Sequence, residues 1–310
     1  MLSVNQFSKH YGDFTAVSDL SFTVEKGDVV ALLGANGSGK TTTINAICRL
    51  VDFESGDITF DGKSVKHSAK YLKRVGAVLG GCRNINWRLS PIQNAEYFAR
   101  LHNAKQRDFR PFIQQLLDLL GLREYQHHIT RTLSTGNKQK TALLCALAHN
   151  PNLLLLDEPT LGLDMETVEA LEHTLKSFAQ QGEHGFLITS HDMHFIDRLC
   201  QRVIVIDKGK EIFSGDISTL KDQLYRYELN IEVAADVLPL LLKEVPKHWP
   251  SNIAMTPTDK GIQIFYNLPD AVFPTIQWLN DNAIRPSHLS INELTIENAY
   301  RTLLTTSKAH

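Results

Sequence analysis

The chain has 310 residues, of which 43% are hydrophobic and 21% are charged, and this ordinary globular composition excludes a disordered, a collagen-like and a disulfide-scaffold protein. Its 32 Lys and Arg residues against 34 Asp and Glu residues give a formal net charge of -2, so the basic excess of nucleic-acid-binding proteins is missing and no nucleic-acid partner is expected. The length favours about two domains, of which the second would be small.

The purely apolar runs, such as residues 153–156 and 240–242, are short. A helix needs ~20 apolar residues to span a bilayer, so we expect that this chain does not cross a membrane by itself. The N-terminal residues show neither a charged start followed by an apolar core nor a small-residue cleavage site. We therefore expect the protein to stay on the cytoplasmic side of the membrane.

Short apolar runs predict the strands of a parallel sheet at Val29–Leu33, Leu153–Leu156 and Phe186–Thr189. Helical patterns alternate with these runs, and this alternation indicates an α/β fold. Helices with little intervening strand pattern are predicted at 91–102, 109–120 and 137–149. They would form an inserted helical subdomain that covers about residues 84–150.

Glycine and proline are distributed unevenly, which marks a domain boundary. Seventeen of the 18 glycines lie at or before Gly215, whereas seven of the 11 prolines lie at or after Pro239. A hairpin with its turn at Lys208-Gly209 is predicted just before this boundary. We expect a first domain of residues 1–217, a linker of residues 218–227 and a small α+β accessory domain of residues 228–310.

The accessory domain has patterns for four strands and three helices, which predict a βαββαβ unit. The strands are expected at 228–233, 251–256, 261–266 and 284–290. The helices are expected at 235–245, 270–281 and 292–304.

A phosphate-binding loop follows the first predicted strand. Residues 34–41, GANGSGKT, match the pattern G-x-x-x-x-G-K-[ST] and lead into a helix. Glycines let backbone N–H groups turn towards phosphate oxygens, Lys40 would neutralise the β- and γ-phosphates, and the Thr41 hydroxyl would hold Mg²⁺. The motif predicts a nucleotide without saying which reaction follows. The predicted nucleotide site consists of Gly34, Ala35, Asn36, Gly37, Ser38, Gly39, Lys40, Thr41 and Thr42.

Two carboxylates end the four-leucine strand 153–156. Ligands of open α/β sheets bind at the carboxyl ends of the strands, where Asp157 and Glu158 would lie. We expect Asp157 to bind the magnesium ion. Glu158 would point to the opposite side of the strand end and polarise a water towards the γ-phosphate.

Further elements make the chain resemble the ATP-binding cassette (ABC) family over most of residues 1–217. Leu133–Asn137, LSTGN, matches the family's signature sequence. Leu163-Asp164 matches its D-loop, His191 matches its switch histidine, and Tyr11 matches the aromatic residue that stacks on adenine. The fold implied is a P-loop cassette with an inserted helical subdomain, followed here by the accessory domain.

The resemblance implies an ATPase that uses ATP and Mg²⁺, with Glu158 and His191 as catalytic residues. The signature departs from LSGGQ at Thr135 and Asn137, which is similar to exporters of drugs, lipids and polysaccharides. The chain would drive a separate integral membrane permease from the cytoplasmic face of the inner membrane. An importer subunit and a soluble ABC-type ATPase that acts on ribosomes or DNA ends remain alternatives, and a P-loop kinase is less favoured.

The resemblance also implies a homodimer. Two copies would close head to tail, so that Ser134 and Gly136 of one chain meet the γ-phosphate of the ATP that Lys40 of the other chain binds. Asp164 is also expected to belong to the nucleotide site. Trp87 lies in the region through which relatives contact their membrane subunit, and a docking role and a packing role are both open for it.

One departure concerns a family glutamine that binds Mg²⁺ and senses the membrane partner. After the strand predicted at Val75–Leu79 this chain reads Gly80-Gly81-Cys82-Arg83, so no glutamine is present. Either a neighbour such as Asn84 takes its role, or hydrolysis is slower and depends more on the partner, and the second alternative is favoured.

Overall fold

The computed structural model describes residues 1–80, 84–224, 227–234, 236–239, 254–266, 272–293, 296–298, 300 and 303. The chain divides into two compact units, Met1–Asp216 and Ile217–His310. Among the described residues, no helix combines the length and the apolar character that crossing a bilayer requires.

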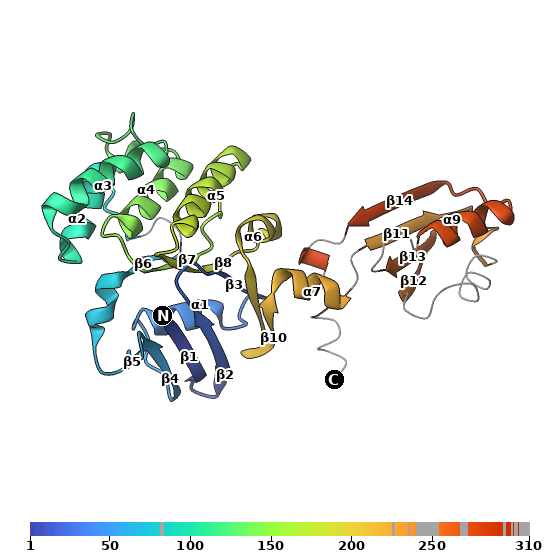
Figure 1. The fold of residues 1–310 in the computed structure, drawn as a ribbon, viewed down its shortest axis with the longest axis horizontal. Helices are drawn as coiled ribbons and strands as arrows, with labels where there is room; N and C mark the ends of the chain where they lie inside the picture. Colours follow the sequence, from blue (N-terminus) through green and yellow to red (C-terminus); the bar gives the residue numbers. More distant parts are fainter. Residues whose placement is uncertain are drawn as a thin grey trace. The chain divides into compact units, whose positions relative to one another are not determined.

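The first unit is built on a six-stranded sheet with the order β10-β9-β3-β8-β7-β6 (Figure 1). The five strands other than β10 are parallel, and every residue of β3, β7 and β8 is buried. Burial on both faces explains why these strands are nearly continuous apolar runs. The strands are β3 (Val29–Gly34), β6 (Val75–Val78), β7 (Leu153–Asp157), β8 (Gly185–Thr189), β9 (Arg202–Asp207) and β10 (Lys210–Asp216).

A second, antiparallel sheet has the order β2-β1-β4-β5. Its strands are β1 (Leu2–Tyr11), β2 (Phe14–Val24), β4 (Ser55–Phe60) and β5 (Lys63–Ser64). Helix α1 (Lys40–Ile47) contributes to the same core: Phe7 of β1, Ile44 of α1 and Leu155 of β7 belong to one buried cluster. The phosphate-binding loop that opens α1 therefore rests on a rigid base.

The helical subdomain lies between β6 and β7 in the sequence, and Figure 1 shows its helices (green) gathered at one end of the unit. It contains α2 (Pro91–Leu101), α3 (Gln106–Leu119) and α4 (Thr135–Leu147). Helix α4 begins two residues before its predicted start at 137, because the Ser134 hydroxyl accepts a hydrogen bond from Asn137 N and caps the helix. The first unit also holds α5 (Met165–Gln180) and α6 (Met193–Leu199).

The predicted hairpin at the end of the first unit is confirmed. Strands β9 and β10 pair in antiparallel fashion around Lys208 and Gly209, whose φ angles of 47° and 82° suit a tight turn. Gly209 N donates a hydrogen bond to Ser38 O at 3.1 Å. The hairpin turn therefore braces the phosphate-binding loop.

In the second unit, helix α7 (Ile217–Leu224) precedes an antiparallel sheet with the order β12-β13-β11-β14. Its described elements are β11 (Tyr227–Glu232), β12 (Ala254–Thr258), β13 (Gly261–Tyr266), α9 (Val272–Asp281) and β14 (His288–Glu293). This order of strands and helix fits the predicted βαββαβ unit. Most of the helix predicted at 235–245 lies outside the described residues.

The last predicted strand, 284–290, is wrong by several residues. Ala283 has a φ of 54°, Ala283 N donates to Asn280 O, and Ile284 N donates to Leu279 O, which together close the end of α9 as a Schellman motif. Ile284 and Leu279 are both buried in the core of this unit. Ile284, whose apolar side chain suggested a strand, thus closes the C-terminal end of α9, and β14 begins later. The helix predicted from 292 consequently starts after β14, and residues 296–298 are helical.

Candidate functional site

At two positions of the phosphate-binding loop, no residue other than glycine fits. A Cβ atom on Gly34 would lie 2.2 Å from Ser38 Oγ and 2.4 Å from Ile206 O. A Cβ atom on Gly39, whose φ is 109°, would lie 2.5 Å from Ala16 O. The loop thus packs tightly against its neighbours while its backbone curves in front of α1, which is the form of a phosphate cradle.

Lys40 is positioned by the loop itself. Its side chain is buried, and Nζ donates to Gly34 O at 2.7 Å and to Ala35 O at 3.2 Å. Burial lowers the pKa of Lys40, while the nearby Glu158 and Asp157 carboxylates act in the opposite direction. The ammonium group is therefore held at the loop by weak carbonyl partners that a phosphate can replace.

Asp157 and Thr41 meet at the end of β7. Thr41 Oγ1 lies 3.3 Å from Asp157 Oδ2, and Thr189 Oγ1 donates to Asp157 Oδ1 at 2.7 Å. A hydroxyl and a carboxylate oxygen at this spacing are the donor types that Mg²⁺ prefers. No cluster of three or more His, Cys, Asp or Glu residues suited to a metal ion occurs among the described residues, so such an ion would need further ligands from a phosphate or water.

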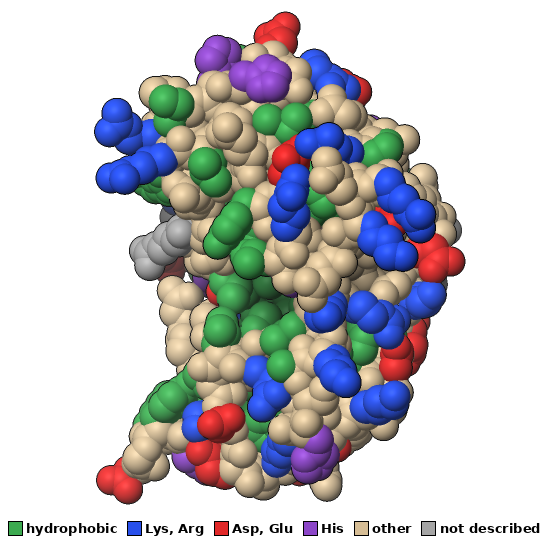
Figure 2. Space-filling model, turned by 90° about the vertical axis from the view of Figure 1, so that its left-hand side faces the viewer, with side chains coloured by type: hydrophobic (Ala, Val, Ile, Leu, Met, Phe, Trp, Pro, Cys, Tyr) green, Lys and Arg blue, Asp and Glu red, His purple; other side chains and the backbone are tan. Residues whose placement is uncertain are grey.

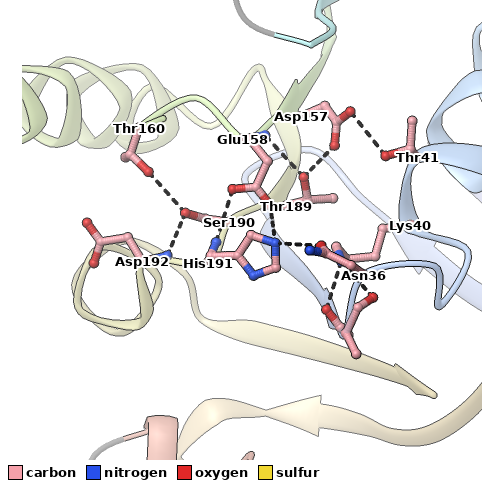
Figure 3. A network of polar contacts seen from close by, with 12 residues as sticks. Asn36, Lys40, Thr41, Asp157, Glu158, Thr160, Thr189, Ser190, His191 and Asp192 are labelled. Atoms are coloured by element: carbon pink, nitrogen blue, oxygen red, sulfur yellow. Dashed lines mark hydrogen bonds and ion pairs between the residues drawn. The ribbon is translucent and has the colours of Figure 1, made fainter. Parts of the chain in front are cut away.

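Glu158 turns away from Asp157 and towards His191 (Figure 3). Its φ of 53° is unusual for a residue other than glycine, and its backbone N–H bonds to both Thr189 O and Thr189 Oγ1 at 3.1 Å. The Glu158 Oε2 atom accepts a hydrogen bond from His191 N at 3.1 Å. The two adjacent carboxylates thus point in different directions, Asp157 towards Thr41 and Glu158 towards His191.

His191 joins Glu158 to the phosphate-binding loop. Its Nε2 atom lies 3.0 Å from Asn36 Oδ1 and 3.4 Å from Glu158 Oε1 (Figure 3). Asn36 Oδ1 can only accept, so Nε2 carries a hydrogen in this contact. The Glu158 Oε1 atom is buried and, apart from this contact with His191, has no hydrogen-bond partner.

These residues line a cavity of about 230 Å³. Most of the predicted nucleotide, magnesium and catalytic residues come together here, and Tyr11 lies at its rim. Phe14, which the sequence interpretation missed, pairs with Tyr11 across the β1–β2 turn, and both rings are about half exposed. The lining residues are Tyr11, Phe14, Ala16, Asn36, Gly37, Gly39, Lys40, Thr41, Thr42, Asp157, Glu158 and His191.

Six predicted residues do not line this cavity: Gly34, Ala35 and Ser38 belong to the phosphate-binding loop itself, whereas Ser134, Gly136 and Asp164 lie elsewhere. Ser134 caps α4, and Asp164 caps α5 by accepting from Thr167 N at 2.8 Å, a bond that lowers the pKa of Asp164. A Cβ atom on Gly136 would lie 3.2 Å from Thr167 Oγ1. The signature and the D-loop therefore lie beside each other, away from the phosphate loop of the same chain.

The position of the missing glutamine lies partly outside the described residues, which exclude 81–83. Asn84 is exposed and lines a different, mainly apolar groove together with Leu50, Phe98 and His102. Figure 2 shows hydrophobic side chains gathered in a hollow on this side of the molecule. Asn84 does not line the cavity of Lys40 and Glu158, so the structure offers no support for its replacing the glutamine.

Comparisons with known proteins identify the family of this chain. A family model described as ABC transporter matches residues 17–161. The chain is 33% identical to the ABC transporter ATP-binding protein NatA of Bacillus subtilis (strain 168), over 74% of this chain and 95% of NatA. This chain belongs to the ABC transporter ATP-binding proteins. As a member of that family it is an ABC ATPase, and it binds ATP.

Two further similarities place the ABC ATPase among its relatives. It is 30% identical to the Nod factor export ATP-binding protein I of Burkholderia lata, over 74% of this chain and 82% of that protein. A solved ATP-binding subunit of an ABC transporter superimposes with a TM-score of 0.67 at 25% identity, over 72% of this chain and 92% of the other. The resemblance to the ABC family and the cassette fold are thereby confirmed.

The exposed Phe14 ring gives a first prediction for this ABC ATPase. Phe14→Ala is expected to weaken ATP binding about tenfold, because stacking of a base on an aromatic side chain contributes ~1–3 kcal/mol. Tyr11→Ala should have a similar effect. Calorimetric titration with ATP measures both, and Leu101→Ala, which removes an exposed apolar side chain of α2 outside the cavity, is the control. Unchanged affinity in Phe14→Ala would leave Tyr11 as the adenine contact.

Proposed function

We propose that this chain is the ATP-hydrolysing subunit of an exporter, and that it works as a homodimer on a separate integral membrane permease at the cytoplasmic face of the inner membrane. The observation that carries the proposal is the divergence of two adjacent carboxylates, with Asp157 directed to Thr41 and Glu158 directed to His191. Export is favoured over import because a relative that is 30% identical is named for Nod factor export.

The phosphate end of the nucleotide would be held by Lys40 and Thr41. Lys40 exchanges its bonds to Gly34 O and Ala35 O for phosphate oxygens, a stronger charge-assisted contact. Thr41 and Asp157 fit Mg²⁺ by the chemistry of their donor atoms, and a bound Mg²⁺ would neutralise charge on the phosphates. Thr42 follows at the start of α1, where backbone N–H groups favour anions.

Glu158 is assigned to the attacking water. Its carboxylate takes a proton from the water, whose oxygen forms a bond to the γ-phosphorus while the bond from that phosphorus to the bridging oxygen breaks. ADP leaves with the bonding electron pair. His191 holds Glu158 through its backbone N–H and is held in turn by Asn36, so that the carboxylate keeps its direction.

The proposed dimer completes the site. Ser134, Gly136 and Asp164 lie outside the cavity within one chain, and the N-terminal turn of α4 offers a hydroxyl and backbone N–H groups for an anion. We expect the Ser134 hydroxyl and the N–H groups of this turn in one chain to reach the γ-phosphate held by Lys40 of the second chain. ATP would then bridge two subunits, and hydrolysis would remove the bridge.

The permease is the part of the proposal that one experiment tests directly. Trp87 is about half exposed, which leaves part of its ring available for a partner, beside a contact of the ring with Lys138 Nζ at 5.3 Å. Isolation of the chain from gently solubilised membranes, followed by mass spectrometry, is expected to yield a partner with several apolar segments of ~20 residues. Ribosomal or chromosomal proteins in stoichiometric amount would instead support the soluble ABC ATPase.

Thr189 gives a prediction about how Asp157 and Glu158 are positioned. Thr189→Val keeps the shape of the side chain but removes the hydroxyl that donates to Asp157 and accepts from Glu158 N. We expect the ATPase kcat to fall about tenfold with little change in KM, since one such hydrogen bond to a charged group contributes ~1.5–3 kcal/mol. Thr174→Val is the control, because it removes another buried hydroxyl bond, to Ala170 O in α5, far from the carboxylates in sequence. Equal rates in both variants would contradict the positioning role.

A further inference from the structure

A strongly basic segment lies in a chain whose formal net charge is -2. Residues 61–74, DGKSVKHSAKYLKR, contain five Lys or Arg residues and a single acidic residue, Asp61. The segment follows β4 and lies at the left edge of the unit in Figure 1. Such a concentration of one sign of charge creates a local positive potential although the whole protein is slightly acidic.

The segment has a firm base. Val65 is buried in the core, and Tyr71 packs its ring 5.6 Å from that of Phe60 and donates to Ile47 O at the end of α1. A 3-10 helix, η1 (Ala69–Arg74), carries the last residues. The lysines therefore project from fixed backbone positions.

Two of the five cations already have partners. Arg74 forms an ion pair with Asp61 at 2.5 Å, donates to Asn152 Oδ1 at 2.6 Å and lies 5.0 Å from the Phe60 ring. Lys66 donates to Gly56 O. In the part of the chain that the structure describes, the exposed Lys63, Lys70 and Lys73 have no ion pair, and we call these three residues the lysine surface.

Two residues of the lysine surface, Lys63 and Lys70, line a hollow of about 520 Å³. The unpaired cations in its lining are Lys63 and Lys70, and they lie beside the ion pair of Arg74 with Asp61. The hollow is lined by Phe60, Asp61, Lys63, Ser64, Ser68, Lys70, Tyr71 and Arg74. This combination of size and charge suits a phosphate-bearing group.

We propose that the lysine surface is a contact site for the anionic phospholipid headgroups of the membrane. Clusters of basic side chains near a membrane bind such headgroups by charge, and lysine acts there as a flexible point charge. An acidic protein surface would be recognised better by free arginines, but Arg74 is engaged by Asp61, and Arg49 donates to Lys66 O at 3.4 Å.

The neighbourhood of the lysine surface supports a membrane rather than a dissolved anion. Leu50 follows Arg49, is one of the most exposed apolar side chains of the first unit, and lines the apolar groove together with Leu72 of η1. Figure 2 shows Lys and Arg side chains beside hydrophobic ones on this face. Charge next to exposed apolar side chains is the combination that membrane interfaces bind. The choice of occupant rests on the proposed location at the cytoplasmic face of the membrane.

A vesicle-binding experiment tests the proposal without ATP and without a permease. The full-length chain is mixed with phosphatidylcholine vesicles, with or without added phosphatidylglycerol, and the bound fraction is measured by sedimentation. The variant K63Q/K70Q/K73Q is compared with K26Q/K105Q/K210Q, which removes the same charge from exposed lysines elsewhere in the first unit. ATP binding by both variants verifies that they are folded.

We expect the wild type and the control variant to bind only the anionic vesicles, and ~1 M salt, where the Debye length is about 3 Å, to release them. Each lysine near an anionic surface strengthens binding about fivefold, so the variant of the lysine surface should bind about 100-fold more weakly. Equal binding by both variants, or no preference for anionic vesicles, would overturn the proposal. If the wild type does not bind vesicles, but K63Q/K70Q/K73Q loses its membrane attachment in the cell, the lysine surface binds an acidic protein instead. Each of these results leaves the assignment of Glu158 untouched.

Discussion

Glu158→Gln is expected to lower the ATPase rate at least 100-fold while ATP affinity stays within about threefold of the wild type. The amide cannot accept the water's proton as a carboxylate does, and general-base catalysis contributes ~10²–10⁴-fold. Binding should survive because the contacts of Lys40 and Thr41 with the phosphates do not involve Glu158 Oε2, which is occupied by His191 N. Phosphate release and calorimetric titration measure the two quantities separately.

The same variant tests the dimer. If Ser134 and Gly136 of one chain contact ATP bound by the other, blocked hydrolysis should leave the two subunits together. Sedimentation of Glu158→Gln is therefore expected to show a dimer with ATP and Mg²⁺ and a monomer with ADP. Glu169→Gln, the same change at an exposed position of α5, is the control and should hydrolyse ATP normally. Wild-type turnover in Glu158→Gln would remove the proposed catalytic assignment.

The parts of the site that depend on local sequence were predictable. The phosphate loop needs a strand, glycines at tight positions and a following helix, all within one short stretch of chain. Gly34 and Gly39 have no room for a Cβ atom, so the residue pattern and the geometry have the same cause. The acid pair was equally visible because it ends a buried strand of four leucines.

Residues that act across long sequence separations were not predictable in this way. Thr189 bonds to both Asp157 and Glu158, but only because β8 lies parallel to β7, and nothing local to Thr189 marks this role. Phe14 reaches the cavity because β1 and β2 pair with Tyr11 opposite to it. The two-residue turn Gly12-Asp13 after Tyr11 is a sequence signal that could have indicated that Phe14 lies opposite Tyr11.

The antiparallel sheet of β1, β2, β4 and β5 escaped prediction for a physical reason. Strand β1 has register shifts against β2, and Gln6 and Asp19 have positive φ angles of 47° and 57°. Such irregularities break the strict alternation of buried and exposed residues by which a strand is recognised. Tertiary packing also explains why β14 begins later than predicted. Ile284 closes the C-terminal end of α9 and packs in the core, and it is not part of the strand.

Lys40→Ala is expected to weaken Mg-ATP binding about 100-fold, since a charge-assisted hydrogen bond contributes ~1.5–3 kcal/mol and Lys40 can make more than one. The loss should be much smaller for adenosine, which has no phosphates for Lys40 to contact. Calorimetric titration with both ligands separates this effect from collapse of the loop, which would weaken both alike. Lys26→Ala, which removes an exposed lysine near β3, is the control for a general loss of charge.

The pH dependence of ATP binding provides a second test of the same residue. Burial lowers the pKa of Lys40, and only its protonated form attracts phosphate, so the affinity should fall as the pH rises. The fall should begin at a lower pH than an ordinary exposed lysine would give, and it should be absent in Lys40→Ala. Titrations of the wild type and the variant over the same alkaline range measure the difference. An identical pH profile in both would mean that Lys40 does not carry the phosphate contact, and the site would then depend on the loop backbone and Thr41.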